Sequence, residues 1–180
     1  MPSAHDNLIV ITGGPGAGKT TLINLLREAG FATAPEAGRA IIQDQSAIGG
    51  SGLPWHDRAL FAELMLCWDL RSYRWAGQQS GPVFFDHAIP GLPAYYRLIG
   101  RDVPAHVAAA ADRFRYRTRV FVAPPWPEIY RTDAERHQSP DEARRTYDAV
   151  VDAYTGNGYR LTELPFVPPP ERLRFVLAHA

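Results

Sequence analysis

The chain has 180 residues, of which 46% are hydrophobic and 21% are charged, as in an ordinary globular domain. Nineteen acidic residues balance 19 basic ones, so the net charge lacks the basic excess that is usual in nucleic-acid-binding domains. The single cysteine excludes an internal disulfide, and the apolar run near the N-terminus, residues 8–11, is too short for a signal peptide or a membrane span, which predicts a cytoplasmic protein.

Strand patterns alternate with helix patterns along the whole chain. Short apolar runs predict strands at residues 7–12, 31–34, 83–85, 118–122 and 159–164. Amphipathic stretches predict helices at residues 19–29, 35–44, 55–75, 92–99, 104–114, 139–155 and from 170 onward, with a glycine-rich loop at 45–54. This alternation predicts one α/β domain over residues 1–180, with three layers and a parallel sheet whose ligands bind beyond the C-terminal strand ends.

Two local patterns lead to specific expectations. Cys67 lies in an apolar stretch of the longest predicted helix, so we expect a buried thiol in the core. Ser139-Pro140-Asp141-Glu142 has the spacing of a capping box, with Ser139 as the N-cap of a helix and Pro140 at its first position.

The segment after the first predicted strand matches the phosphate-loop pattern G-x-x-x-x-G-K-[ST]. Glycines allow backbone N–H groups to surround phosphate oxygens, the helix start adds positive dipole, and a lysine and a hydroxyl reach the terminal phosphates and Mg²⁺. Lys19 is the only lysine of the chain, which makes a chance match improbable. We therefore expect binding of Mg-ATP by Gly13, Gly14, Pro15, Gly16, Ala17, Gly18, Lys19, Thr20 and Thr21.

Four charged or polar side chains follow the other predicted strands. Asp86 is a candidate ligand of Mg²⁺ together with Thr20, and its alternative role is that of a helix cap. Glu36 is a candidate base for an acceptor hydroxyl, and Arg39, one turn later, is a candidate phosphoryl or acceptor ligand. The alternative is that both only begin a helix, where a glutamate is favoured. We expect His87 to line the acceptor site, because no zinc spacing surrounds it.

The segment 124–139 is polar, rich in proline and arginine, and predicts a lid that brings Arg131 and Arg136 to the phosphates. The alternative is an exposed arginine-rich loop. Arg113, Arg115, Arg117 and Arg119 alternate with other residues, but we interpret them as a solvated approach to a strand, and a nucleic-acid partner is not expected. Residues 166–170 follow the last strand, where an adenine would rest in this topology.

These motifs together resemble a known family, the small bacterial AAA-domain predicted ATPases, which are related to the nicotinamide-riboside-kinase domain and to nucleoside and nucleotide kinases. The resemblance covers nearly the whole chain. It rests on the segments GGPGAGKTTL (13–22), PEAGRAII (35–42), FFDHAIPGLPAYYRLIG (84–100), VFVAPPWPEIYRTDAERHQSPDEA (120–143) and GYRLTELPFVPPPERLRFVL (158–177). It implies a five-stranded sheet of order 2-3-1-4-5, Mg-ATP as the phosphoryl donor, Glu36 as base and an arginine lid.

The chain departs from this family pattern after the third strand. Relatives have a segment like D-R-G-x-P-D, where this chain has His87 in place of the arginine and Gly91 in place of the second aspartate. If those residues handle the acceptor in relatives, the departure implies a different acceptor or weaker transfer.

The leading hypothesis from the sequence is a phosphotransferase that moves the γ-phosphoryl group of Mg-ATP to a small-molecule hydroxyl. The alternatives are an ATP-hydrolysing switch with a macromolecular partner, a non-catalytic nucleotide-binding module, and a polynucleotide kinase. A Ras-type GTPase is disfavoured, because its guanine signature needs a second lysine. The identity of the acceptor and the oligomeric state stay open.

Overall fold

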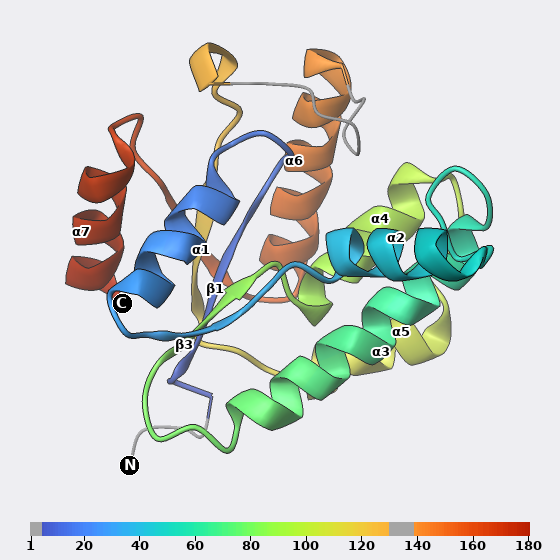
Figure 1. Cartoon of the computed structure of the whole chain (residues 1–180), viewed down its shortest axis with the longest axis horizontal. Coiled ribbons are helices and arrows are strands. Elements are labelled where there is room, and N and C mark those ends of the chain that lie inside the picture. The colour runs from blue at the N-terminus through green and yellow to red at the C-terminus, as the bar shows by residue number, and fades with distance from the viewer. Residues whose placement is uncertain (1–4, 130–138) are drawn as a thin grey trace.

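A computed structural model describes residues 5–129 and 139–180. Five parallel strands form one sheet in the order β2-β3-β1-β4-β5, which confirms the predicted topology. Figure 1 shows helices on both faces of this sheet, as expected for three layers. The strands are β1 (Leu8–Gly13), β2 (Ala32–Ala34), β3 (Val83–Asp86), β4 (Arg119–Ala123) and β5 (Arg160–Glu163).

The sheet is buried on both faces, because successive strand residues point to opposite sides. Leu8 and Val10 pack into one apolar cluster, and Ile9 and Ile11 pack into another. The first cluster is covered by α3 (Arg58–Ala76), α4 (Leu92–Leu98), α5 (Ala105–Arg113) and α6 (Pro140–Gly156). The second is covered by α1 (Lys19–Glu28) and α7 (Pro169–His179).

Helix α2 (Ala37–Ile48) lies against α3 and away from the centre of the sheet (Figure 1). Ala37 and Ile41 of α2 pack there on Phe61 of α3. Two short 3-10 turns, η1 (Ile89–Gly91) and η2 (Pro127–Ile129), complete the elements of the described residues. The first leads from β3 into α4, so the chain that follows Asp86 stays close to the phosphate loop.

The predicted boundary between the second helix and the loop after it was wrong. Helix α2 continues through residues 45–48, which we had assigned to the loop. Its stop is Gly49, which adopts a left-handed φ of 66° that favours glycine, and the N–H of Gly50 bonds to the carbonyl of Gln45 at 2.8 Å. Helix α2 therefore ends at Gly49, the first glycine of the predicted loop, and the polar residues before this glycine do not end it.

The prediction of a buried cysteine was also wrong, because Cys67 is exposed. It follows the buried Leu66 by one position, which is about 100° around the helix and off the face that meets the sheet. The capping box is confirmed: the Ser139 hydroxyl accepts from the N–H of Glu142 at 3.2 Å, and the Glu142 carboxylate accepts from the N–H of Ser139 at 2.7 Å. None of the helices formed by the described residues is long and apolar enough to cross a membrane.

Candidate functional site

The phosphate loop connects the end of β1 to the start of α1, in the strand–turn–helix context that the motif requires. Gly13 has a φ of 132°, and a Cβ there would overlap the carbonyl oxygen of Ala123 at the end of β4. A Cβ on Gly14 would lie 2.8 Å from the carbonyl oxygen of Ala143 in α6. The loop is thus clamped between β4 and α6, and only glycine fits at either position.

Within the described part of the chain, all four buried polar or charged side chains lie around this loop; they are Thr12, Lys19, Asp86 and Arg172. Burying a charged side chain costs free energy unless the charge is paired, so a cluster of buried charged side chains indicates a candidate functional site. The Nζ atom of Lys19 donates to the carbonyl oxygen of Gly14 at 2.6 Å. The ammonium therefore lies across the loop, at the place where a phosphate-binding lysine is needed.

Thr20 and Asp86 meet beside the loop, as expected for a magnesium site. The Thr20 hydroxyl donates to Oδ2 of Asp86 at 3.5 Å, although the two residues are 66 positions apart in the chain. A hydroxyl and a carboxylate at the phosphate loop are oxygen ligands of the kind that Mg²⁺ uses next to nucleotide phosphates. The pair fits a magnesium ion that is completed by phosphate and water oxygens.

A cavity of about 550 Å³, here called the large cavity, opens from the phosphate loop and extends to α3 and α4. Its volume is in the range of small-molecule sites. Gly13, Pro15 and Lys19 line one end of it, and Glu36, Arg39 and His87 line its wall. The sequence-predicted acceptor residues are therefore brought together with the phosphate loop in a single space.

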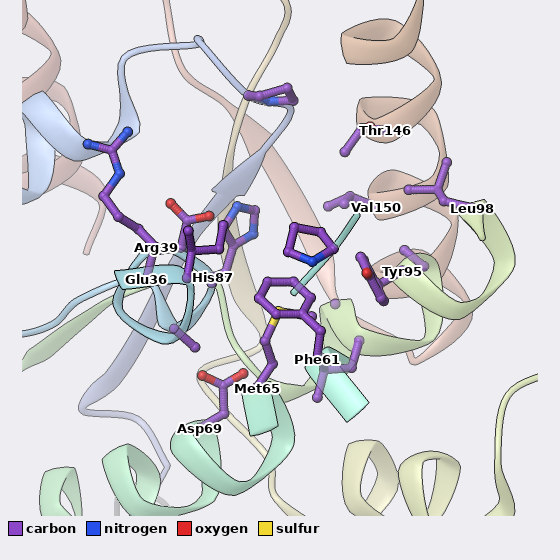
Figure 2. Close-up of a pocket in the computed structure, with 18 of the residues that line it drawn as sticks. Glu36, Arg39, Phe61, Met65, Asp69, His87, Tyr95, Leu98, Thr146 and Val150 are labelled. Carbon is purple, nitrogen blue, oxygen red and sulfur yellow. The ribbon is translucent and has the colours of Figure 1, made fainter. Parts of the chain in front are cut away.

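Glu36 occupies the N-cap position of α2, but its side chain makes no capping hydrogen bond. Figure 2 shows its carboxylate beside the His87 ring, while Arg39 extends away from Phe61 and Tyr95. The position of Glu36 at a helix start agrees with the alternative interpretation, whereas the direction of its carboxylate favours a role in the cavity.

His87 adopts a left-handed φ of 63°, the only positive φ among the described residues other than glycine. Its ring nitrogen Nδ1 lies 3.0 Å from the Thr12 hydroxyl, and its N–H bonds to the carbonyl of Ile11 at 3.0 Å. This conformation is uncommon and persists where surrounding contacts hold it. Both departures from the family pattern, His87 and Gly91, line the large cavity.

Asp69 of α3 also lines the large cavity, and it is not among the site residues that the sequence predicts. Burial raises the pKa of its carboxyl to about 7, and the negative charge of Glu36 adds to the rise. The available signal was an acidic residue among Trp68, Leu70 and the other apolar residues of this helix, because a carboxylate in a partly buried apolar segment is unfavourable.

The raised pKa of Asp69 predicts a pH dependence of stability. Folding raises this pKa from 3.8 to about 7, so the folded chain holds the proton in this interval and the free energy of unfolding falls as the pH rises through it. Relative to the variant Asp69→Asn, we expect the wild type to lose on the order of 2–3 kcal/mol between pH 5 and pH 8. Urea unfolding of both proteins at both pH values measures this difference.

Three titratable groups interact with Asp69: Glu36 at the N-cap of α2, whose charge raises the pKa of Asp69, and Tyr116 before β4 and Tyr154 of α6, whose pKa values the charge of Asp69 raises. The two tyrosines are neutral below pH 8 because burial raises the pKa of each well above its usual value. The exposed Asp112 supplies the matched control, since Asp112→Asn should leave the pH profile unchanged. An Asp69→Asn profile parallel to that of the wild type would contradict the prediction.

A second, smaller hollow of about 330 Å³ lies on the other side of the phosphate loop, between α1 and α7. Trp126 lines this hollow, its ring lies 5.4 Å from that of Phe166, and the Arg172 guanidinium stacks over the Trp126 ring at 4.6 Å. Arg172 also donates from Nη1 to the carbonyl of Ala17 at 2.7 Å, which ties α7 to the loop. This hollow adjoins the segment 166–170 where we expect adenine, and the adenine assignment stays a prediction.

Comparison with protein families matches residues 8–172 to the AAA domain. The chain belongs to the AAA domain family. A comparison of this AAA domain protein with curated proteins finds no match.

The fold of the AAA domain protein is shared by solved structures of kinases. A deoxyadenosine kinase from M. mycoides is 11% identical, with a TM-score of 0.69 and coverage of 96% of this chain and 97% of that one. A thymidylate kinase from Ehrlichia chaffeensis is 17% identical, with a TM-score of 0.61 and coverage of 96% and 98%. NadR in complex with NR is 18% identical, with a TM-score of 0.64; the match covers 97% of this chain and 50% of the NadR chain. These likenesses show a kinase-like P-loop fold.

Two candidate residues of the AAA domain protein, Arg131 and Arg136, belong to the part of the predicted lid that lies outside the described residues. Of the alternating arginines, Arg115 donates to the carbonyl of Asn157 at 2.8 Å and stacks on Tyr159 at 4.3 Å, and Arg119 donates to the carbonyl of His179 at 2.7 Å. These two side chains connect neighbouring elements of the fold; Arg119 is exposed, as predicted for a solvated segment, whereas Arg115 is partly buried.

Proposed function

We propose that this AAA domain protein is a kinase that transfers the γ-phosphoryl group of ATP to a hydroxyl of a small molecule. The observation that carries the proposal is the large cavity, which contains Lys19 at one end and continues past Glu36 to a compartment far larger than a water molecule needs. A switch that only hydrolyses ATP needs room for one water beside the phosphate. A second ligand is the simplest use of the remaining space.

The arrangement of residues in the large cavity supports a distinct role for each side chain in the phosphoryl transfer. Lys19 and the backbone N–H groups of the loop would hold the phosphates, and Thr20 and Asp86 would hold a magnesium ion that neutralises phosphate charge. Glu36 would accept the proton of the acceptor hydroxyl while the acceptor oxygen bonds to the γ-phosphorus. The bond from that phosphorus to the bridging oxygen breaks, and ADP leaves with the electron pair.

A turnover assay with the purified chain, Mg²⁺ and ATP tests this function. We expect ADP to form only when an acceptor is present, so pools of hydroxylated ring compounds, sugars and vitamins are added in turn. ADP release without any acceptor would instead indicate an ATP-hydrolysing switch. Binding of ATP with no ADP in any pool would indicate a non-catalytic nucleotide-binding module.

A further inference from the structure

The end of the large cavity away from the phosphate loop has the lining of a site for a flat ring. We call it the ring compartment, and it is lined by Phe61, Met65, Asp69, Tyr95 and Leu98. The Phe61 and Tyr95 rings stand 5.8 Å apart at 60° to each other, and Met65 lies next to Phe61 (Figure 2). Aromatic rings and a thioether are the side chains that stack favourably on a planar ligand.

Two polar groups face this otherwise apolar space. Asp69 extends its carboxyl from α3 toward Met65 (Figure 2), and Tyr95 contributes a hydroxyl from α4. Among the described residues, no group bonds to the buried Tyr95 hydroxyl. Because a buried polar atom without a partner is costly, a ligand that bonds to it and to Asp69 would gain affinity and orientation.

Charged side chains of both signs line the large cavity, and they differ in where their charges lie. Glu36 and Asp69 both line the cavity, and Arg39 extends away from Phe61 and Tyr95 (Figure 2). Arg58, in the first turn of α3, also lines the cavity and its charge acts on Tyr95, but the side chain is exposed and donates from Nε to the carbonyl of Pro54 at 3.0 Å. A phosphate or carboxylate on the ligand ring would be removed from water next to Asp69, which is unfavourable.

We infer that Asp69 recognises the ring of the phosphoryl acceptor, and that this ring is neutral or cationic, presents an N–H donor to Asp69 and carries no acidic group. The inference rests on the proposed kinase function, since it concerns the acceptor of that reaction. The acceptor would place its ring against Phe61, Met65 and Tyr95, with a hydroxyl arm reaching back past Glu36 to the phosphate loop.

Three pyrimidine nucleosides of equal frame test the inference: cytidine presents an amino donor, uridine presents a carbonyl at the same position, and orotidine adds a ring carboxylate. Calorimetry with the full chain, Mg²⁺ and a non-hydrolysable ATP analogue measures the affinity of each. We expect cytidine to bind at least about 10-fold more tightly than uridine, and orotidine to bind most weakly, because a missing partner for a buried polar group costs about that much. Adenosine and inosine repeat the comparison for a larger ring.

The variant Asp69→Asn should reduce the preference for cytidine over uridine to about 3-fold or less, because an amide both donates and accepts. Asp112→Asn, an exposed change of the same chemistry, should keep the preference. Urea unfolding at pH 8 checks whether Asp69→Asn folds, and at this pH we expect the variant to be more stable than the wild type. If that variant does not fold, the preference of the wild type for amino over carbonyl rings at pH 8 decides by itself.

The inference would be overturned if cytidine bound as tightly as uridine and adenosine as tightly as inosine. It would also be overturned if none of these nucleosides bound. Tightest binding of orotidine that is lost in Arg58→Ala would overturn it as well, since this would place an acidic ring against Arg58. The kinase proposal fails in a different way. If the donor-bearing nucleosides bind with the expected preference but yield no phosphorylated product with ATP, the ring site stands and the transfer does not.

Discussion

Replacing Lys19 with alanine should lower ATP-dependent turnover by at least 10²-fold, which corresponds to about 2.7 kcal/mol of lost transition-state stabilisation. The side chain is 6% exposed, and its Nζ atom lies 2.6 Å from the carbonyl of Gly14, inside the loop itself. No other described basic side chain is buried in this loop to replace it, since Arg172 lies behind it and donates to Ala17. A steady-state ADP-release assay with the acceptor identified by the screen measures the effect.

Two further variants separate charge from packing at this position. Lys19→Met keeps most of the aliphatic stem and removes only the ammonium, so its turnover should fall as far as that of the alanine variant. Lys19→Arg should also be impaired, because a planar guanidinium does not fit a nest built for a compact ammonium. Near-normal turnover of the methionine variant, with unchanged thermal unfolding, would remove the phosphate-loop assignment.

The two carboxylates should respond differently to isosteric replacement. Asp86 is 4% exposed and accepts from Thr20, so Asp86→Asn should weaken Mg²⁺-dependent ATP binding and turnover together. Glu36 lines the large cavity on its acceptor side, so Glu36→Gln should bind Mg-ATP normally. Its phosphoryl transfer should nevertheless fall by about 10²-fold or more, the usual contribution of a positioned general base.

Calorimetric Mg-ATP affinities of both variants, measured beside their turnover, decide between these roles. Glu63→Gln is the matched control for Glu36, because Glu63 is not among the residues that line the large cavity and instead pairs with Tyr96 at 2.8 Å and with His106 at 2.9 Å. Loss of nucleotide affinity in Glu36→Gln with normal affinity in Asp86→Asn would show that the assignments are reversed. Normal turnover of Glu36→Gln would make Glu36 a helix-start residue and leave the proposed kinase without its base.

The sequence alone determined the features that depend on short stretches of chain. The phosphate loop, the capping box at Ser139 and the order of strands and helices are local, because each follows from contiguous residue types and their periodicity. The strand order 2-3-1-4-5 came from the resemblance to a family, since no local pattern states which strands are neighbours. The error at residues 45–48 shows the usual limit of local signals at a helix end, where a single glycine decides.

Only the tertiary structure decided which distant residues share the site. The helices that carry Asp69, Tyr95 and Phe61 have the composition of ordinary core helices. The segments that carry Trp126 and Arg172 are far from the phosphate loop in the chain. Cys67 shows the converse, an apolar context in the sequence that folding places at the surface. The physical reason is that burial and the shifted pKa of Asp69 arise from neighbours on other elements, and a parallel sheet with long crossovers brings those elements together only when the whole domain folds.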